Sequence, residues 1–227
     1  MHIIDLSQTM KDGLQTYKGL PEIHVCSHLS REDSRQHYED GAEFQIDDIQ
    51  LIGNSGTYID SPFHRYKDGK DLAALSLAAT VNLPGIVIRA PSASPWASVE
   101  LSAVKGRDVK GKAVLIETGW CRYFGSSAYY EGHPFLSADA AQYLRDVGAA
   151  LVGIDSHNID DTRGRKRPVH TTLLGAEIPI VEHMTNLNAL PDQGFRFFAA
   201  PIKFEGVGTF PTRAYALMDD QPSPAKA

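Results

Sequence analysis

Two side chains four residues apart, an aspartate and a histidine, could perform chemistry together in this sequence. Asp60 and His64 flank Pro62 in the stretch 53–65, which opens with glycines and polar residues that favour a tight turn. Because proline lacks a backbone N–H and restrains its neighbours, a helix carrying both side chains on one face is disfavoured. The pattern favours a strand end that runs into a rigid loop and holds a carboxylate and an imidazole at a fixed separation. The spacing equally permits a surface loop with a salt-bridged Asp60 and a solvated His64.

A second carboxylate stands at the end of an apolar segment. Glu182 follows Ile178-Pro179-Ile180-Val181, which is typical of a buried strand with proline at its start. A carboxylate in that place is costly to bury unless a cation pairs with it. A buried ion pair with an arginine or a lysine would meet this requirement.

The stretch that carries Asp60 and His64 resembles the signature of the metal-dependent hydrolase/cyclase superfamily, which includes bacterial kynurenine formamidases. The usual form of that signature is His-x-Gly-Thr-His-x-Asp-x-Pro-x-His. The matching positions here are Gly56, Thr57, Asp60, Pro62 and His64. Asn54 and Tyr58 stand where the family has two metal-binding histidines.

The resemblance covers nearly the whole chain, from Asp5 to Arg213, because further motifs follow in the family's order. They are Asp5-Leu6-Ser7, Tyr17 with Gly19, Thr118-Gly119-Trp120, Asp155 to Asp160, His170 with Glu182, and Asn186-Leu187. It implies that Asp60, His170 and Glu182 bind one divalent metal ion, Zn or Mn, and that Asn54 adds a weak carbonyl ligand.

The resemblance also implies the other site residues. His64 would be the general acid/base, and Tyr58 would donate a hydrogen bond to a developing oxyanion. Tyr17, Phe63 and Trp120 would bind the substrate. Without the resemblance, Tyr17 is a packed tyrosine in a surface loop, and a tryptophan at a strand end such as Trp120 is more often part of the core.

Three functions follow from this resemblance. The first is hydrolysis of an amide or ester, with N-formylkynurenine (arylformamidase chemistry, in tryptophan breakdown) as the family's best-known substrate. The second is an isatin-type amidohydrolase or a lactonase. The third, from another class, is a metal-free protein that binds a small molecule without catalysis, in which Asn54 and Tyr58 mark a lost metal centre.

The elements that must position these residues alternate between strands and helices. Buried strands are expected at 85–89, 112–120, 149–155 and 197–203, and one more strand at 44–52. Helices are expected at 137–147, with Ser137 as N-cap and Gly148 at its end, and at 98–104, with Ser98 as N-cap. A helix followed directly by a strand indicates an α/β arrangement. By resemblance the fold is a mixed sheet curled towards a barrel with flanking helices, similar to the swivelling β/β/α folds.

Composition limits the class of protein. The 227 residues carry a net charge of −6 and 22% charged residues, which gives no electrostatic sign of a nucleic-acid partner. No apolar run is long enough for a membrane span, and no secretory signal begins the sequence. We therefore expect one domain at 1–218, a polar and disordered tail at 219–227, a cytoplasmic location and a small-molecule substrate. By resemblance the chain forms a homodimer or homotetramer.

Overall fold

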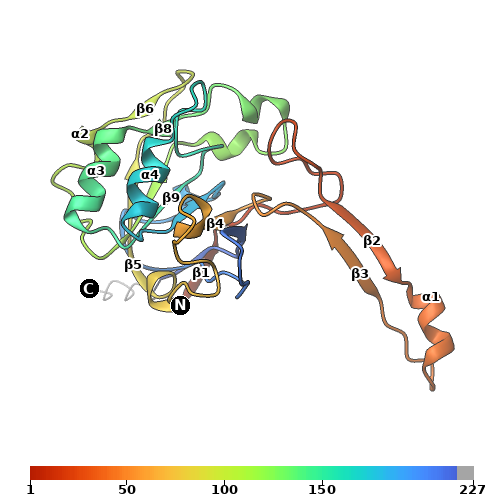
Figure 1. Ribbon diagram of the computed structural model, residues 1–227. Coiled ribbons are helices and arrows are strands. Elements are labelled where there is room, and N and C mark those ends of the chain that lie inside the picture. The colour runs from red at the N-terminus through yellow and green to blue at the C-terminus, as the bar shows by residue number, and fades with distance from the viewer. Residues whose placement is uncertain (219–227) are drawn as a thin grey trace, which may run out of the picture.

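One mixed sheet forms the body of the computed structural model, which describes residues 1–218 (Figure 1). Its nine strands are β1 (His2–Asp5), β4 (Tyr58–Asp60), β5 (Leu83–Arg89), β7 (Ala113–Glu117), β9 (Leu151–Ile154), β10 (Ile180–Glu182), β11 (Gln193–Phe198), β12 (Thr209–Pro211) and β13 (Tyr215–Met218). Their order across the sheet is β1-β13-β11-β5-β7-β9-β10-β4-β12. The strands from β5 to β10 pair in parallel, and the remaining pairs are antiparallel.

The central parallel strands are buried on both faces, which is why their sequences read as continuous apolar runs. Successive side chains of a strand point to opposite faces. Ile86 and Ile88 therefore pack on one side of the sheet, and Val87 between them packs on the other. The predicted strands at 85–89, 112–120 and 149–155 are confirmed as the cores of β5, β7 and β9.

Three helices cover one face of the sheet. They are α2 (Leu101–Val104), α3 (Ala138–Val147) and α4 (Pro168–Gly175). The predicted start of α3 is confirmed, since the Ser137 hydroxyl accepts a hydrogen bond from the Ala140 N–H. Gly148 ends this helix in the left-handed conformation that glycine adopts without strain.

The other face of the sheet curls around a second core. Val87, Leu115 and Val181 meet Phe197 and Ala216 there, and the sheet becomes a half-barrel. The predicted fold, a curled mixed sheet with flanking helices, is therefore confirmed. Within residues 1–218, no helix is long and apolar enough to cross a membrane.

A long arm projects from this body (Figure 1). Strands β2 (His24–Leu29) and β3 (Ile46–Gln50) pair only with each other, and α1 (Arg31–Ser34) lies near their far end. The predicted strand at 44–52 is thus real but lies in this arm, with all five residues of β3 exposed. A second two-stranded sheet joins β6 (Ser98–Val99) to β8 (Phe135–Leu136).

Two element predictions were wrong in detail. Ser98 does not cap a helix, because it pairs with Phe135 in β6, and Glu100 is the residue that precedes α2. The strand predicted at 197–203 is β11, which ends at Phe198. The chain leaves the ladder before Pro201, whose ring nitrogen carries no donor, and Ala199 N–H turns to the Thr80 carbonyl instead. The tail predicted at 219–227 lies outside the described residues.

Candidate active site

Asp60 and His64 are held by a strand end followed by a tight turn, as the sequence predicts. Asp60 is the last residue of β4, and Pro62 begins a single turn of 3-10 helix that ends at His64. Gly208 makes this arrangement compact. A Cβ atom on Gly208, the residue before β12, would lie 2.5 Å from the His64 backbone nitrogen. Only glycine therefore lets the chain pass this close to the turn.

Three potential metal ligands meet at this point. One ligand atom from each of Asp60, His64 and His170 lies within 4.8 Å of the other two. His64 Nε2 is 3.9 Å from Asp60 Oδ1, and His170 Nε2 is 3.6 Å from Asp60 Oδ2. Asp60 Oδ1 accepts a hydrogen bond from the Thr209 hydroxyl at 2.6 Å. Asp60 Oδ2 is buried and has no hydrogen-bond partner among the described residues.

His170 is oriented by a carboxylate that the ligand prediction did not include. Asp160 accepts hydrogen bonds from the backbone N–H groups of Val169 and His170, at 2.8 and 3.1 Å, and so caps the first turn of α4. The same carboxylate lies 2.6 Å from His170 Nδ1. This contact places the proton on Nδ1 and turns Nε2 towards Asp60, the arrangement that holds metal-ligating histidines in many proteins.

Glu182 is held from both sides. Tyr58 and Glu182 are directly opposite each other on the antiparallel strands β4 and β10, so their side chains share a face. The Tyr58 hydroxyl donates a short hydrogen bond to Glu182 Oε2, and the Ile159 backbone N–H donates to Oε1 at 2.5 Å. Oε2 also lies 3.9 Å from His170 Nε2.

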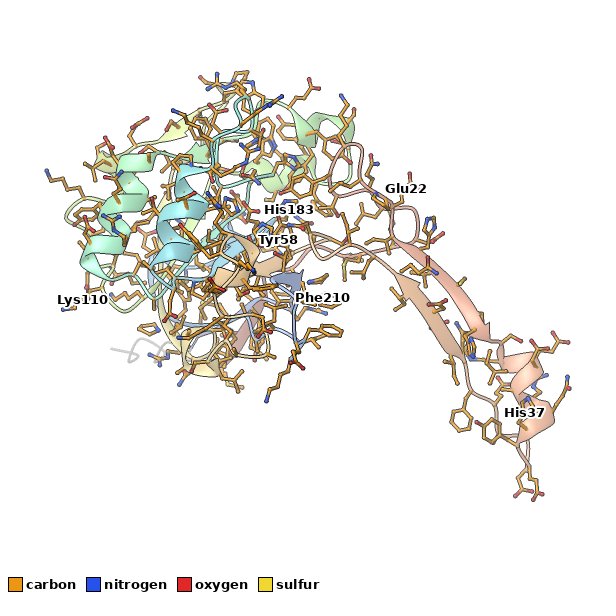
Figure 2. All side chains as sticks on the ribbon, in the orientation of Figure 1. Glu22, His37, Tyr58, Lys110, His183 and Phe210 are labelled. Atoms are coloured by element: carbon orange, nitrogen blue, oxygen red, sulfur yellow. The ribbon has the colours of Figure 1, made fainter. Side chains whose placement is uncertain are left out.

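Tyr58 is the end of a hydrogen-bonded chain that starts in a buried aromatic cluster. The Asn158 amide donates to the Tyr17 hydroxyl at 3.1 Å, and that hydroxyl lies 2.6 Å from the Tyr58 hydroxyl. Because Tyr58 gives its proton to Glu182, Tyr17 is the donor between the two phenols. Rings of His157 and His183 pack against Tyr17, and Figure 2 shows His183 beside Tyr58.

Burial and neighbouring charges shift the pKa values of these groups. Burial raises the pKa of Glu182 to about 7. Burial disfavours charge on His170 as well, but hydrogen bonds with Asp160 and Asp60 and the charge of Glu182 outweigh it and raise its pKa to about 10. Burial tends to raise the pKa of Asp60, yet contact with His170 and the charge on His64 bring it below its ordinary value. Burial keeps the pKa of Tyr58 well above the usual range, so this hydroxyl remains a donor.

The donor set fits a divalent cation. Three buried carboxylates, on Asp60, Asp160 and Glu182, surround one buried imidazole, His170. Even with that ring protonated, negative charge is in excess, which is costly away from water. A cation between Asp60, His64 and His170 would use the unpartnered Asp60 oxygen and relieve the excess. Two imidazoles with one carboxylate form a ligand set typical of transition metals.

The site opens into a cavity of about 570 Å³. His64 and His170 lie in its wall with Asn158 and Thr171. Its lip is strongly basic, with side chains from Arg65, Arg165, Lys166 and Arg167.

The other predicted site residues lie at different distances from this centre. Tyr17 reaches it through Tyr58. Trp120 is buried with its indole N–H donating to the Tyr129 carbonyl at 3.0 Å, and neither Trp120 nor Phe63 lines the cavity. The Asn54 side chain is half-buried and makes no hydrogen bond among residues 1–218. The substrate roles of Tyr17, Phe63 and Trp120 and the ligand role of Asn54 stay predictions.

Sequence reasoning missed several residues that shape the site. Asp160 lay in the motif from Asp155 to Asp160, but nothing in its spacing from His170 shows that the two touch. Thr209 carries no motif, and its contact with Asp60 arises from the pairing of β12 with β4. The run from Arg163 to Arg167, with four basic residues in five, is the signal in the sequence for the basic lip.

Comparison with known proteins finds relatives that align over nearly the whole chain. The chain is 25% identical over 211 residues to kynurenine formamidase of Bacillus cereus, covering 93% of this chain and 95% of that protein. It is 24% identical over 227 residues to the kynurenine formamidase of Salinibacter ruber, covering 99% of this chain and all of that one.

Solved structures show the same fold. An isatin hydrolase bound to the product analogue thioisatinate superposes with a TM-score of 0.83 at 22% identity, covering 96% of this chain and 92% of that one. A protein described as a potential metal-dependent hydrolase with cyclase activity superposes with a TM-score of 0.77 at 23% identity, covering 97% of this chain and 99% of that one. The sequence model of the Cyclase family matches residues 4–161, more than half of the chain, and the protein therefore belongs to the Cyclase family.

Proposed function

We propose that this protein is a metal-dependent hydrolase of an amide or ester bond, with one divalent cation held by Asp60, His64 and His170. The observation that carries the proposal is the buried and unpartnered Asp60 Oδ2, which faces His170 Nε2 at 3.6 Å beside an open cavity. A bound cation would polarise the substrate carbonyl and lower the pKa of a water molecule.

We infer that His64 is a metal ligand and that Glu182 is the general base, which reverses the roles that the family resemblance implies for these two residues. His64 has a ring nitrogen within ligand range of Asp60 and His170. Each oxygen of Glu182 accepts one hydrogen bond, from Tyr58 or from Ile159, and keeps a second lone pair that can accept a proton. With its pKa at about 7, Glu182 suits the general base that takes a proton from the nucleophile near neutral pH.

Tyr58 and Asp160 position these groups. Tyr58 fixes the Glu182 carboxylate through its hydroxyl, and its own orientation is fixed by Tyr17. Asp160 fixes the His170 ring. Tyr58 and Asp160 are buried and Tyr17 is half-buried, so the site is organised before any substrate arrives.

Arylformamidase chemistry is the first candidate reaction, since the relatives aligned over nearly the whole chain are named kynurenine formamidases. Hydrolysis of isatin or of a lactone is the second candidate, because the neighbour with a TM-score of 0.83 is an isatin hydrolase. Both reactions break an acyl bond and need the same proton transfers. Zn and Mn are the candidate metals for a set of two imidazoles and one carboxylate.

The test begins with metal content and binding. Protein purified without chelator should contain about one equivalent of Zn or Mn by elemental analysis, and the stripped protein should bind the metal in calorimetry. Asp60→Asn should abolish tight binding, whereas Asp161→Asn, at a partly exposed carboxylate paired with Arg163, should leave it intact. Equal affinity in Asp60→Asn and wild type would refute the ligand set.

Activity is then screened with formanilides, N-formylkynurenine, isatin and aryl lactones. Turnover of one of these compounds, lost in both Asp60→Asn and Glu182→Gln, supports the hydrolase. Absence of metal after reloading together with absence of turnover would favour a metal-free protein that binds a small molecule. The one observation in favour of that alternative is that Tyr58 stands in place of a histidine and donates its hydroxyl to a Glu182 oxygen.

The assembly and location expected from the sequence stay predictions. They are a homodimer or homotetramer in the cytoplasm.

A further inference from the structure

The lip of the cavity beside the candidate metal centre carries four basic side chains, Arg65, Arg165, Lys166 and Arg167. Among the described residues, no aspartate or glutamate lines this cavity. The chain as a whole has a net charge of −6, so the lip is a local excess of positive charge on an acidic protein. Like charges around one opening repel one another, and an anion that enters between them relieves this repulsion.

The charges of the lip are not neutralised within the chain. Arg165 and Lys166 form no ion pair or hydrogen bond through their side chains among residues 1–218. Arg167 donates to three backbone carbonyl oxygens, and Arg65 donates to the Thr171 hydroxyl at 3.2 Å. A neutral oxygen orients a guanidinium group but leaves its charge in place, so all four side chains keep their charge for a ligand.

The loop that carries three of these side chains is held in place from outside the cavity. The Thr162 hydroxyl lies 2.8 Å from Nε2 of the buried His133. The Arg163 guanidinium carbon lies 5.3 Å from the centre of the Trp96 ring, a cation–π contact. Because the loop is already fixed, an anion at the lip does not have to order it, and that saves free energy of binding.

The lip and the metal centre are built on the same two elements. Arg65 directly follows His64 at the end of the 3-10 turn, and Arg167 immediately precedes α4, three residues before His170. Residues three apart on a helix are neighbours on its surface. A molecule whose carbonyl lies at the metal centre therefore extends towards the lip, and its far end meets these cations.

We propose that the substrate of this site is an amide or ester that carries a carboxylate or another anionic group and no ammonium group. The inference rests on the proposed function, since it names the substrate class of the same site. Guanidinium groups suit this role because their planar donors match the two oxygens of a carboxylate. Isatin is neutral and leaves the lip unpaired, and the ammonium group of N-formylkynurenine brings a like charge to it.

The first experiment compares substrates that share one scissile bond and differ only in charge. They are meta-formamidobenzoate, formanilide and meta-(aminomethyl)formanilide, which are anionic, neutral and cationic. At low ionic strength kcat/KM should fall in that order, with the anion at least about tenfold above the neutral compound, the lower end of what a cleft of one charge contributes. Added salt should narrow the difference because it screens the lip. Equal kcat/KM values for the three compounds would overturn the proposal.

The second experiment removes the two unpaired charges of the lip. Arg165→Gln with Lys166→Gln should lower the ratio of kcat/KM for meta-formamidobenzoate to that for formanilide about tenfold. The matched control is Lys105→Gln with Lys110→Gln, which removes the same charge from two exposed lysines that do not line the cavity (Lys110 is labelled in Figure 2). The control should keep the wild-type ratio. A wild-type ratio in the lip variant would overturn the proposal.

Binding of a stable compound separates this inference from the proposed reaction. Calorimetry with meta-aminobenzoate, the product of meta-formamidobenzoate, reports the anion site whether or not the protein hydrolyses anything. The lip variant should bind it about tenfold more weakly and keep its affinity for the metal. Binding that is lost in Asp60→Asn and unchanged in the lip variant would place the carboxylate on the metal and overturn the proposal.

The outcomes for the lip and for the reaction differ. Binding of meta-aminobenzoate that depends on the lip, without turnover of any amide or ester, would refute the hydrolase and keep the anion site. Turnover that is indifferent to substrate charge would keep the hydrolase and refute the anion site. If the lip variant fails to fold by circular dichroism, the order of the three wild-type kcat/KM values and their salt dependence decide the question.

Discussion

Replacing Asp160 by asparagine tests how the fold prepares His170 to bind a cation. The carboxylate accepts three hydrogen bonds, from the His170 ring and from the backbone N–H groups of Val169 and His170. An asparagine has only one acceptor oxygen, so its NH₂ group must face one of these donors whichever way the amide turns. The variant therefore loses at least one hydrogen bond to a buried charged group and gains a donor-to-donor contact.

The expected size of the effect follows from these contacts. A hydrogen bond to a charged group contributes about 1.5–3 kcal/mol, and an outer partner of a metal ligand typically changes metal affinity by about 10- to 100-fold. Because about 1.4 kcal/mol corresponds to a factor of ten, the two estimates agree. The Kd for Zn or Mn should therefore rise about 10- to 100-fold. The free energy of unfolding should fall by about 1–2 kcal/mol, because the first turn of α4 loses its cap.

The assay combines calorimetry of metal binding with chemical denaturation of the metal-free protein. Asp161→Asn is the control, since this neighbouring carboxylate is partly exposed and pairs with Arg163 rather than with His170. Wild-type metal affinity in Asp160→Asn would show that the tautomer and orientation of His170 do not limit binding. A lower free energy of unfolding with unchanged metal affinity would mean that Asp160 acts only as the cap of α4.

Three further predictions concern the groups around the metal centre. Tyr58→Phe leaves the buried Glu182 Oε2 without its donor, so denaturation should show a loss of about 1–3 kcal/mol. Tyr123→Phe should show almost none, because the Tyr123 hydroxyl makes no hydrogen bond among the described residues. Burial lowers the pKa of His157 to about 2. Below pH 6.5 this imidazole therefore binds a proton in the unfolded chain but not in the folded chain, and the free energy of unfolding falls as the pH falls. His157→Phe keeps an aromatic ring and removes the titratable nitrogen, so the slope of unfolding free energy against pH below 6 should shrink by about 1.4 kcal/mol per pH unit. An unchanged slope would contradict the burial of a neutral imidazole. Asn54→His with Tyr58→His should raise metal stoichiometry or affinity, since imidazoles bind borderline metals well, and no gain would mean that this loop has diverged in its backbone as well as its side chains.

The sequence determined the family, the type of fold and the elements with strong local signals. The strands at 85–89 and 149–155 are continuous apolar runs because both faces of the sheet are covered, and such runs are visible without coordinates. The helix α3 begins and ends at residues whose capping chemistry is local, Ser137 and Gly148. Pro62 likewise determined that Asp60 and His64 sit on a strand end and a turn.

Only the tertiary structure decided which polar groups touch. Asp160 and His170 meet because a loop returns to the first turn of α4, and Tyr58 meets Glu182 because β4 lies antiparallel to β10 in one particular register. The arm could not be predicted from the sequence either. The apolar pattern of a strand such as 44–52 is the same whether the strand packs against its own core or projects away from it. Local sequence fixes the conformation of a segment, whereas contacts between distant segments depend on how the whole chain packs, and the chemistry of this site lies in those contacts.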